Sequence, residues 1–178
     1  MLLLSCNRLQ LLPMFLGAVC ANVACVFESP GFGVDVLADR MQTLGSVAIC
    51  CEPSWVQEAL DLQRNLASVK HVIPLDEPAH KRDSAASNVI TWSKLLEKGR
   101  ASNGLLPPPI EYREDQICYL TSTSGTTGKP KLVVHTHESL LANVQANSHP
   151  RHMPLGAGDV QLSTTSLGRR VRALRQRL

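Results

Sequence analysis

Short apolar runs alternate along this chain with longer segments in which apolar residues recur every three to four positions. Runs of this length are typical of buried strands, and they lie at residues 23–27, 47–51, 69–74, 117–120 and 132–135. The helical spacing occurs at residues 7–21, 34–44, 54–66, 90–98 and 137–144. This alternation predicts an α/β fold in which a mostly parallel sheet is flanked by helices.

Individual residues predict where several of these helices begin and end. Asn7 is a suitable N-cap for the first helix, and Thr136 for the last. Ser54 and Gln57 have the spacing of a capping box, which places the start of the third helix near Ser54. Gly45 follows the second helix and is expected to end it, because glycine readily adopts the left-handed conformation found after helix C-termini.

The composition fits a globular core, with 44% hydrophobic and 19% charged residues. The net charge of +3 comes from the end of the chain, since five arginines lie within the last ten residues. The remainder is mildly acidic and poor in aromatic residues that could stack on bases. We therefore expect no nucleic-acid partner, and we expect residues 169–178 to form a disordered Arg-rich tail.

The six cysteines show no Cys-x-x-Cys spacing, and most fall in apolar runs. This favours buried, reduced thiols in an intracellular compartment. Four histidines lie in the last third of the chain, but no cysteine or carboxylate completes a recognisable ligand set with them. We expect no metal site. The histidines are His135, His137, His149 and His152.

The uncharged stretch at residues 9–27 leaves an alternative open. Arg8 precedes it and residues 19–21 resemble a signal-cleavage site, which would indicate a small secreted disulfide protein. Gln10, Pro13 and Asn22 interrupt the stretch, which is marginal for a membrane span. A buried helix followed by a buried strand is the favoured interpretation, so no membrane span is expected.

Residues 121–131 form the segment with the clearest chemistry. All eight residues from Thr121 to Gly128 are Ser, Thr or Gly, and two lysines follow without any acid. Such a loop can present backbone N–H groups, hydroxyls and ammonium groups to one anion, which indicates a polyphosphate ligand. The Walker pattern is excluded, because only two residues separate Gly125 from Gly128 and Pro130 follows Lys129. The alternative is that this segment is a flexible linker that binds no ligand.

The order of residues in this loop resembles the phosphate loop of the AMP-forming adenylating enzymes, which include acyl-CoA synthetases, 4-coumarate-CoA ligases and firefly-type luciferases. Their signature reads roughly Ser/Thr-Ser-Gly-Thr-Thr-Gly-x-Pro-Lys-Gly-Val, followed by a Thr-His pair. This chain has Thr123-Ser124-Gly125-Thr126-Thr127-Gly128-Lys129-Pro130-Lys131-Leu132-Val133, and then Thr136-His137. Leu132 departs from the pattern, since the family usually has Gly there. The resemblance extends over about residues 5–168 and is strongest at 114–143.

The resemblance implies an ATP-dependent carboxylate (acyl)-CoA ligase, which forms acyl-AMP and pyrophosphate before the thioester. ATP, Mg²⁺ held through the ATP phosphates, CoA and a small carboxylic acid are the implied cofactor and substrates. Carried over by motif position, the nucleotide-binding residues are Thr123, Ser124, Gly125, Thr126, Thr127, Gly128 and Lys131. His137 is a further candidate, although a histidine at the first turn of a helix is more often satisfied by the backbone.

The resemblance also implies that residues 1–168 are a partial N-terminal (large) domain of an adenylate-forming enzyme. The family's adenine-binding segment, ribose-binding Asp and C-terminal Lys have no counterpart before Leu178. We therefore expect little ligase activity from this chain alone, and no catalytic residue is assigned within it. A non-catalytic nucleotide-phosphate-binding or interaction module stays open as the alternative. The compartment is expected to be cytoplasmic or peroxisomal, with secretion as the alternative.

Overall fold

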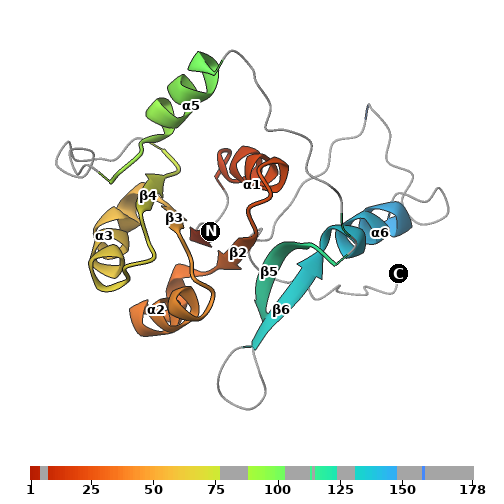
Figure 1. Ribbon diagram of the computed structural model, residues 1–178, viewed down its shortest axis with the longest axis horizontal. Helices are drawn as coiled ribbons and strands as arrows, with labels where there is room; N and C mark the ends of the chain where they lie inside the picture. The colour runs from red at the N-terminus through yellow and green to blue at the C-terminus, as the bar shows by residue number, and fades with distance from the viewer. Residues whose placement is uncertain are drawn as a thin grey trace.

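The computed structural model of the protein describes residues 1–4, 8–76, 88–102, 113, 115–123, 131–147 and 158. Six strands form one sheet with the order β4-β3-β1-β2-β5-β6 (Figure 1). In chain order these strands are β1 (Leu2–Leu4), β2 (Cys25–Glu28), β3 (Ala48–Cys51), β4 (His71–Pro74), β5 (Ile117–Thr123) and β6 (Lys131–Thr136). The helices are α1 (Leu11–Cys20), α2 (Val34–Thr43), α3 (Val56–Asn65), α5 (Trp92–Ala101) and α6 (His137–Asn147).

The strand pairing is parallel from β4 to β5 and antiparallel between β5 and β6. The predicted α/β fold with a mostly parallel sheet is therefore confirmed. Strand β1 was not predicted, yet it lies between β2 and β3 in the middle of the sheet. The last two strands form a hairpin at the edge opposite β4 (Figure 1).

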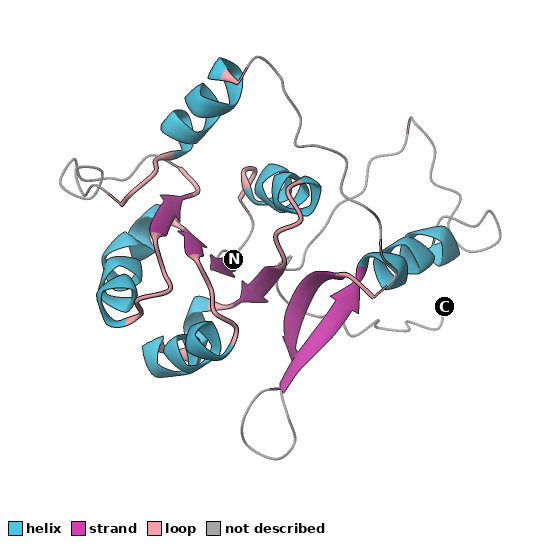
Figure 2. Ribbon diagram, in the orientation of Figure 1, coloured by secondary structure: helices cyan, strands magenta, loops and turns pink. Residues whose placement is uncertain are grey.

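Two apolar layers cover the two faces of the sheet. One contains Leu37 and Met41 of α2 together with Ala59 and Leu62 of α3. The other contains Leu11, Met14 and Ala18 of α1, with Trp92 and Leu95 of α5 packed against it. Figure 2 shows α2 and α3 on one side of the strands and α1 and α5 on the other.

Strand β3 shows how the sheet separates these layers. Ile49 and Cys51 belong to the layer with α2 and α3, whereas Ala48 and Cys50 belong to the layer with α1. Successive side chains of a strand point to opposite faces, and all four residues are buried. A continuously apolar run, with no polar alternation, is therefore what this central strand requires.

Helix ends follow the sequence in two cases. Gly45 has a φ of +58°, the left-handed conformation expected just after α2. Thr136 Oγ1 accepts a hydrogen bond from the backbone N–H of Ser139 at 3.1 Å, which caps α6 as predicted.

The capping box predicted at Ser54 and Gln57 is wrong. Residues Pro53–Trp55 form a short 3₁₀ helix, α3 begins at Val56, and its N-cap Trp55 makes no side-chain capping bond. Pro53 fixes its own φ near the helical value and starts a tight turn there, so the α-helix begins later than the pattern indicated. The proposed cap Asn7 lies outside the described residues, and α1 begins at Leu11.

Candidate functional site

The β5–β6 hairpin brings together the two ends of the predicted phosphate loop. Thr123, the last residue of β5, pairs with Lys131, the first residue of β6. The Thr123 hydroxyl donates a hydrogen bond to the Lys131 carbonyl oxygen at 3.2 Å. We call this residue pair the loop mouth. The other predicted loop residues lie outside the described residues; they are Ser124, Gly125, Thr126, Thr127 and Gly128.

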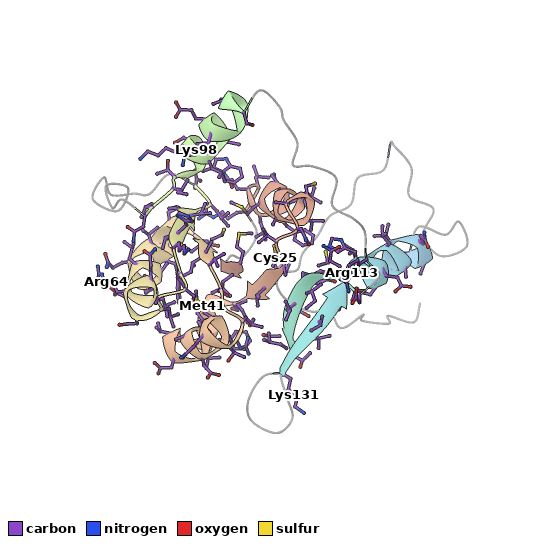
Figure 3. All side chains as sticks on the ribbon, in the orientation of Figure 1. Cys25, Met41, Arg64, Lys98, Arg113 and Lys131 are labelled. Carbon is purple, nitrogen blue, oxygen red and sulfur yellow. The ribbon has the colours of Figure 1, made fainter. Side chains whose placement is uncertain are left out.

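The loop mouth lies at the carboxyl end of β5. Because β5 runs parallel to β2, this is also the end of the sheet at which the other parallel strands finish. Ligands of open α/β sheets bind at this end, where strands pass into loops. Lys131 is exposed, and its side chain extends from the tip of the hairpin (Figure 3). A hydroxyl and an ammonium group therefore stand at the position where the fold class places ligands.

The structure does not bring His137 close to the loop mouth. His137 begins α6, beyond the opposite end of β6, and five strand residues separate it from Lys131. At about 3.3 Å per strand residue, the separation is on the order of 20 Å. Its backbone N–H donates to the carbonyl oxygen of Gln116 at 3.1 Å. That bond satisfies a backbone donor in the first turn of α6, which has no intrahelical partner.

A buried polar network lies one residue before the loop mouth, and sequence reasoning missed it. The Ser122 hydroxyl donates to Glu28 Oε1 at 2.6 Å and accepts a hydrogen bond from Arg40 Nη1. The same Arg40 nitrogen forms an ion pair with Glu28 Oε1. Glu28 is the last residue of β2 and Arg40 lies on α2. One signal was present in the sequence, since Arg40 follows Leu37 by three residues on the apolar stripe of its helix.

An aromatic cluster lies on the other face of the hairpin. Tyr119 of β5 stacks on His135 of β6 and meets the rings of Phe15 and Phe27 edge-on. Thr121 Oγ1 lies 3.3 Å from His135 Nε2, within hydrogen-bonding distance. The pKa of Tyr119 is raised by burial and, secondarily, by Cys118. The aromatic cluster thus holds one face of the hairpin, and the polar network of Glu28, Arg40 and Ser122 holds the other.

The cysteines are free thiols wherever the structure describes them. Cys25, Cys50, Cys51 and Cys118 are buried, and Cys20 is exposed. Burial raises the pKa of Cys25 to about 11 and that of Cys51 to about 12. Within the described ranges, no three His, Cys, Asp or Glu side chains gather as a metal site would require. No helix of the described part of the chain has the length and apolar character of a membrane span.

Residues 1–169 match the model of the AMP-binding enzyme family. The chain belongs to this family. Among curated members, the peroxisomal long chain acyl-CoA synthetase 7 of Arabidopsis thaliana is 36% identical over 106 residues, which are 57% of this chain and 15% of that protein. Fatty acyl-CoA synthetase B of Dictyostelium discoideum is 26% identical over 148 residues, which are 80% of this chain and 22% of that protein.

Two solved structures have the same fold over most of this chain. Apo MbtA of Mycobacterium smegmatis superposes with a TM-score of 0.66 at 25% identity, covering 83% of this chain and 26% of MbtA. Acetoacetyl-CoA synthetase of Streptomyces lividans gives a TM-score of 0.68 at 22% identity, covering 94% of this chain and 26% of the synthetase. The chain thus spans less than a third of the length of each of these four proteins, and its sheet corresponds to part of the N-terminal domain of adenylation enzymes.

Proposed function

We propose that this chain carries the triphosphate-binding part of an ATP-dependent carboxylate–CoA ligase. In that reaction the carboxylate attacks the α-phosphorus of ATP, giving acyl-AMP and pyrophosphate, and the CoA thiol then takes the acyl group. The observation that carries the proposal is the pairing of Thr123 with Lys131 at the carboxyl end of β5. Membership of the AMP-binding enzyme family supports it independently.

The donor chemistry of the loop mouth fits a phosphate anion. Lys131 supplies an exposed point charge, and the Thr123 hydroxyl can turn its single proton from the Lys131 carbonyl oxygen to a phosphate. Negative charge moves onto the β- and γ-phosphates as the α-phosphorus bond breaks, so donors placed there stabilise the transition state more than the ground state. An ammonium group would repel a bare cation, so Mg²⁺ would enter this site bound to ATP. The intervening residues 124–128 complete the proposed cradle, and His137 stands outside it.

Binding of ATP and of pyrophosphate, each with Mg²⁺, tests the proposal by titration calorimetry. Lys131→Ala should weaken both by about tenfold or more, because a charge-assisted hydrogen bond contributes about 1.5–3 kcal/mol. Lys98→Ala is the matched control, since Lys98 is an exposed lysine of α5 far from the hairpin (Figure 3). Its affinity should equal that of the wild type. Absence of wild-type binding, or equal loss in both variants, contradicts the proposal.

Acyl-dependent exchange of pyrophosphate into ATP separates the two candidate activities. We expect the isolated chain to bind MgATP with little exchange, since it spans only 15–22% of the curated relatives described above. Exchange that disappears in Lys131→Ala would assign full adenylation to this chain. Binding without exchange would assign it the phosphate-binding role alone, the alternative of a non-catalytic module.

We also propose an intracellular compartment, cytoplasmic or peroxisomal. The five described cysteines are free, which is typical of proteins kept in a reducing environment. The Arabidopsis relative is named as peroxisomal. Microscopy of the tagged chain with a peroxisomal marker tests this proposal, using an internal or N-terminal tag that leaves the C-terminus free. Secretion into the medium would contradict it.

A further inference from the structure

The network of Glu28, Arg40 and Ser122 joins three elements directly behind the loop mouth. Glu28 ends β2, Arg40 lies in the second half of α2, and Ser122 is the penultimate residue of β5. Phe27 pairs with Thr121 in the parallel register, so Glu28 lies alongside Ser122 on the neighbouring strand. The Ser122 hydroxyl bonds to both charged partners.

Both charged side chains are almost fully removed from water. Glu28 is 1% exposed and Arg40 is 5% exposed. The Arg40 guanidinium also lies over the ring of Phe32, 5.1 Å from its centre. Burial lowers the pKa of Arg40, but a guanidinium stays charged inside proteins. The network is therefore a buried ion pair bridged by one hydroxyl.

Stability alone does not account for such an arrangement. Removing two charges from water costs several kcal/mol per ion, and apolar residues of the same size often stabilise a fold equally well. Glu28 Oε2 has no hydrogen-bond partner among the described residues, which adds to the cost. Ionic groups form directional hydrogen bonds, which an apolar cluster does not. Glu28 of β2 and Arg40 of α2 therefore hold the Ser122 oxygen at one position.

The position of the Ser122 oxygen affects the position of the loop mouth through the backbone. Ser122 pairs with Leu132 across the hairpin, and the next pair is Thr123 with Lys131. Side chains alternate along a strand, so Ser122 faces α2 while the Thr123 side chain faces the opposite side. A displacement of Ser122 along β5 therefore moves the Thr123 hydroxyl and its Lys131 partner together.

We propose that Glu28 and Arg40 are positioning residues, which hold Ser122 so that Thr123 and Lys131 are pre-arranged for a polyphosphate. The inference rests on the proposed function for the identity of the ligand. Neither charged residue touches the ligand, and both act through Ser122. Pre-arranged donors bind an anion without the loss of freedom that ordering them would cost.

Pyrophosphate with Mg²⁺ is the probe, and the full chain is used throughout. Ser122→Ala removes the bridging hydroxyl and keeps the ion pair; it should weaken binding by about tenfold. Ser122→Thr retains a hydroxyl on a residue type that strands accommodate, and should restore affinity to within about threefold of the wild type. Thr91→Ala is the control for general destabilisation, because Thr91 is buried and caps α5 away from the hairpin. It should bind as the wild type does.

Hydrogen exchange gives a second readout that does not depend on the ligand. In Ser122→Ala the backbone amides of residues 121–123 and 131–133 should exchange about tenfold faster, whereas those of β3 and β4 should be unchanged. Glu28→Gln, which removes the negative charge from the ion pair with Arg40, should show the same pattern. Uniform acceleration across the sheet in either variant would indicate a purely structural role and overturn the inference.

The outcomes distinguish this inference from the proposed function. Wild-type binding that is unaffected by Ser122→Ala overturns the positioning role and leaves the function standing. Equal loss in Ser122→Thr and Ser122→Ala also overturns it, since the hydroxyl is then not the deciding group. If the wild type binds no pyrophosphate, the proposed function fails, and the hydrogen-exchange pattern alone decides whether the network fixes the loop mouth.

Discussion

The rings of Tyr119 and His135 stack across the β5–β6 hairpin, with centroids 4.4 Å apart and planes inclined by 10°. The two residues are direct partners in the antiparallel register, so the stack is a cross-strand pair. Phe15 of α1 meets Tyr119 edge-on at 5.8 Å and thereby ties the hairpin to the helix that covers the sheet. The hairpin is the only antiparallel pairing among the described strands, and this cluster is one of its attachments.

His135→Ala should lower the free energy of unfolding by about 0.5–1.5 kcal/mol more than the neighbouring Val134→Ala does, because ring pairs contribute about that much beyond their buried area. Val134 is 51% exposed on the same strand and serves as the control. His135→Phe should recover most of the loss, since it preserves the stack although it removes the hydrogen bond to Thr121. Urea unfolding measures all three; equal losses at positions 134 and 135 would contradict the expectation.

Gly45→Ala should destabilise the protein by about 1 kcal/mol, because Gly45 has a φ of +58° and a side chain there is strained. Space is not the cause, since a Cβ at Gly45 would meet nothing within 4 Å. A Cβ at Gly99 would also meet nothing within 4 Å, but Gly99 lies inside α5. Gly99→Ala should therefore stabilise by about 0.5–1 kcal/mol. Thermal unfolding should shift in opposite directions for the two variants.

Thr91→Ala should cost about 1 kcal/mol of folding free energy, because the Thr91 hydroxyl accepts a hydrogen bond from the backbone N–H of Lys94 at the start of α5. The same substitution at Thr136 removes the cap of α6, where the hydroxyl accepts from Ser139. Thr91 is 3% exposed, and the backbone donor that it caps lies in a part-buried site. Thr91→Ala should therefore lower the free energy of unfolding by more than Thr136→Ala does, as measured by urea unfolding. The reverse order would show that burial does not decide the cost of removing a cap.

Stability should fall as the pH rises from about 9 to about 11. Burial raises the pKa of Cys25 to about 11 and of Cys51 to about 12, whereas thiols of the unfolded chain ionise near 8.5. Over this window the unfolded chain has released protons that the folded chain still holds, so unfolding becomes easier as pH increases. The urea midpoint measured between pH 8 and 10.5 should fall less steeply in a Cys25→Ala/Cys51→Ala double variant. Identical slopes would contradict the prediction.

Most of the fold could be predicted because its elements carry local periodic patterns. The apolar run at 47–51 needs no knowledge of its partners to be assigned as a strand, and it became β3. Strand β1 was missed because Leu2–Leu4 is only three residues long, too short for a period to be counted. The misplaced start of α3 has a different cause, since Pro53 competed locally with the capping pattern at Ser54.

The candidate site also contains residues that a local pattern predicts and residues that only the fold brings together. Thr123 and Lys131 were predicted from a contiguous motif, and a hairpin necessarily brings the two ends of its own loop together. The partners of Ser122 could not be found this way, because Glu28 is 94 residues away in the sequence. Only the fold places β2 beside β5. A charged residue on an apolar helix stripe, as at Arg40, is the kind of local hint that indicates a buried partner elsewhere in the chain.

That separation of 94 residues between Glu28 and Ser122 also has a consequence for biosynthesis. Closing so long a loop is entropically costly, and β5 can join the sheet only after β1 to β4 have emerged and offered it an edge. The docking of β5 and β6 is therefore expected to be a late event in maturation. If the proposed function holds, an unfinished polypeptide that stops before Lys131 does not bind nucleotide. Binding of polyphosphate would then distinguish chains whose synthesis has passed the hairpin from shorter ones.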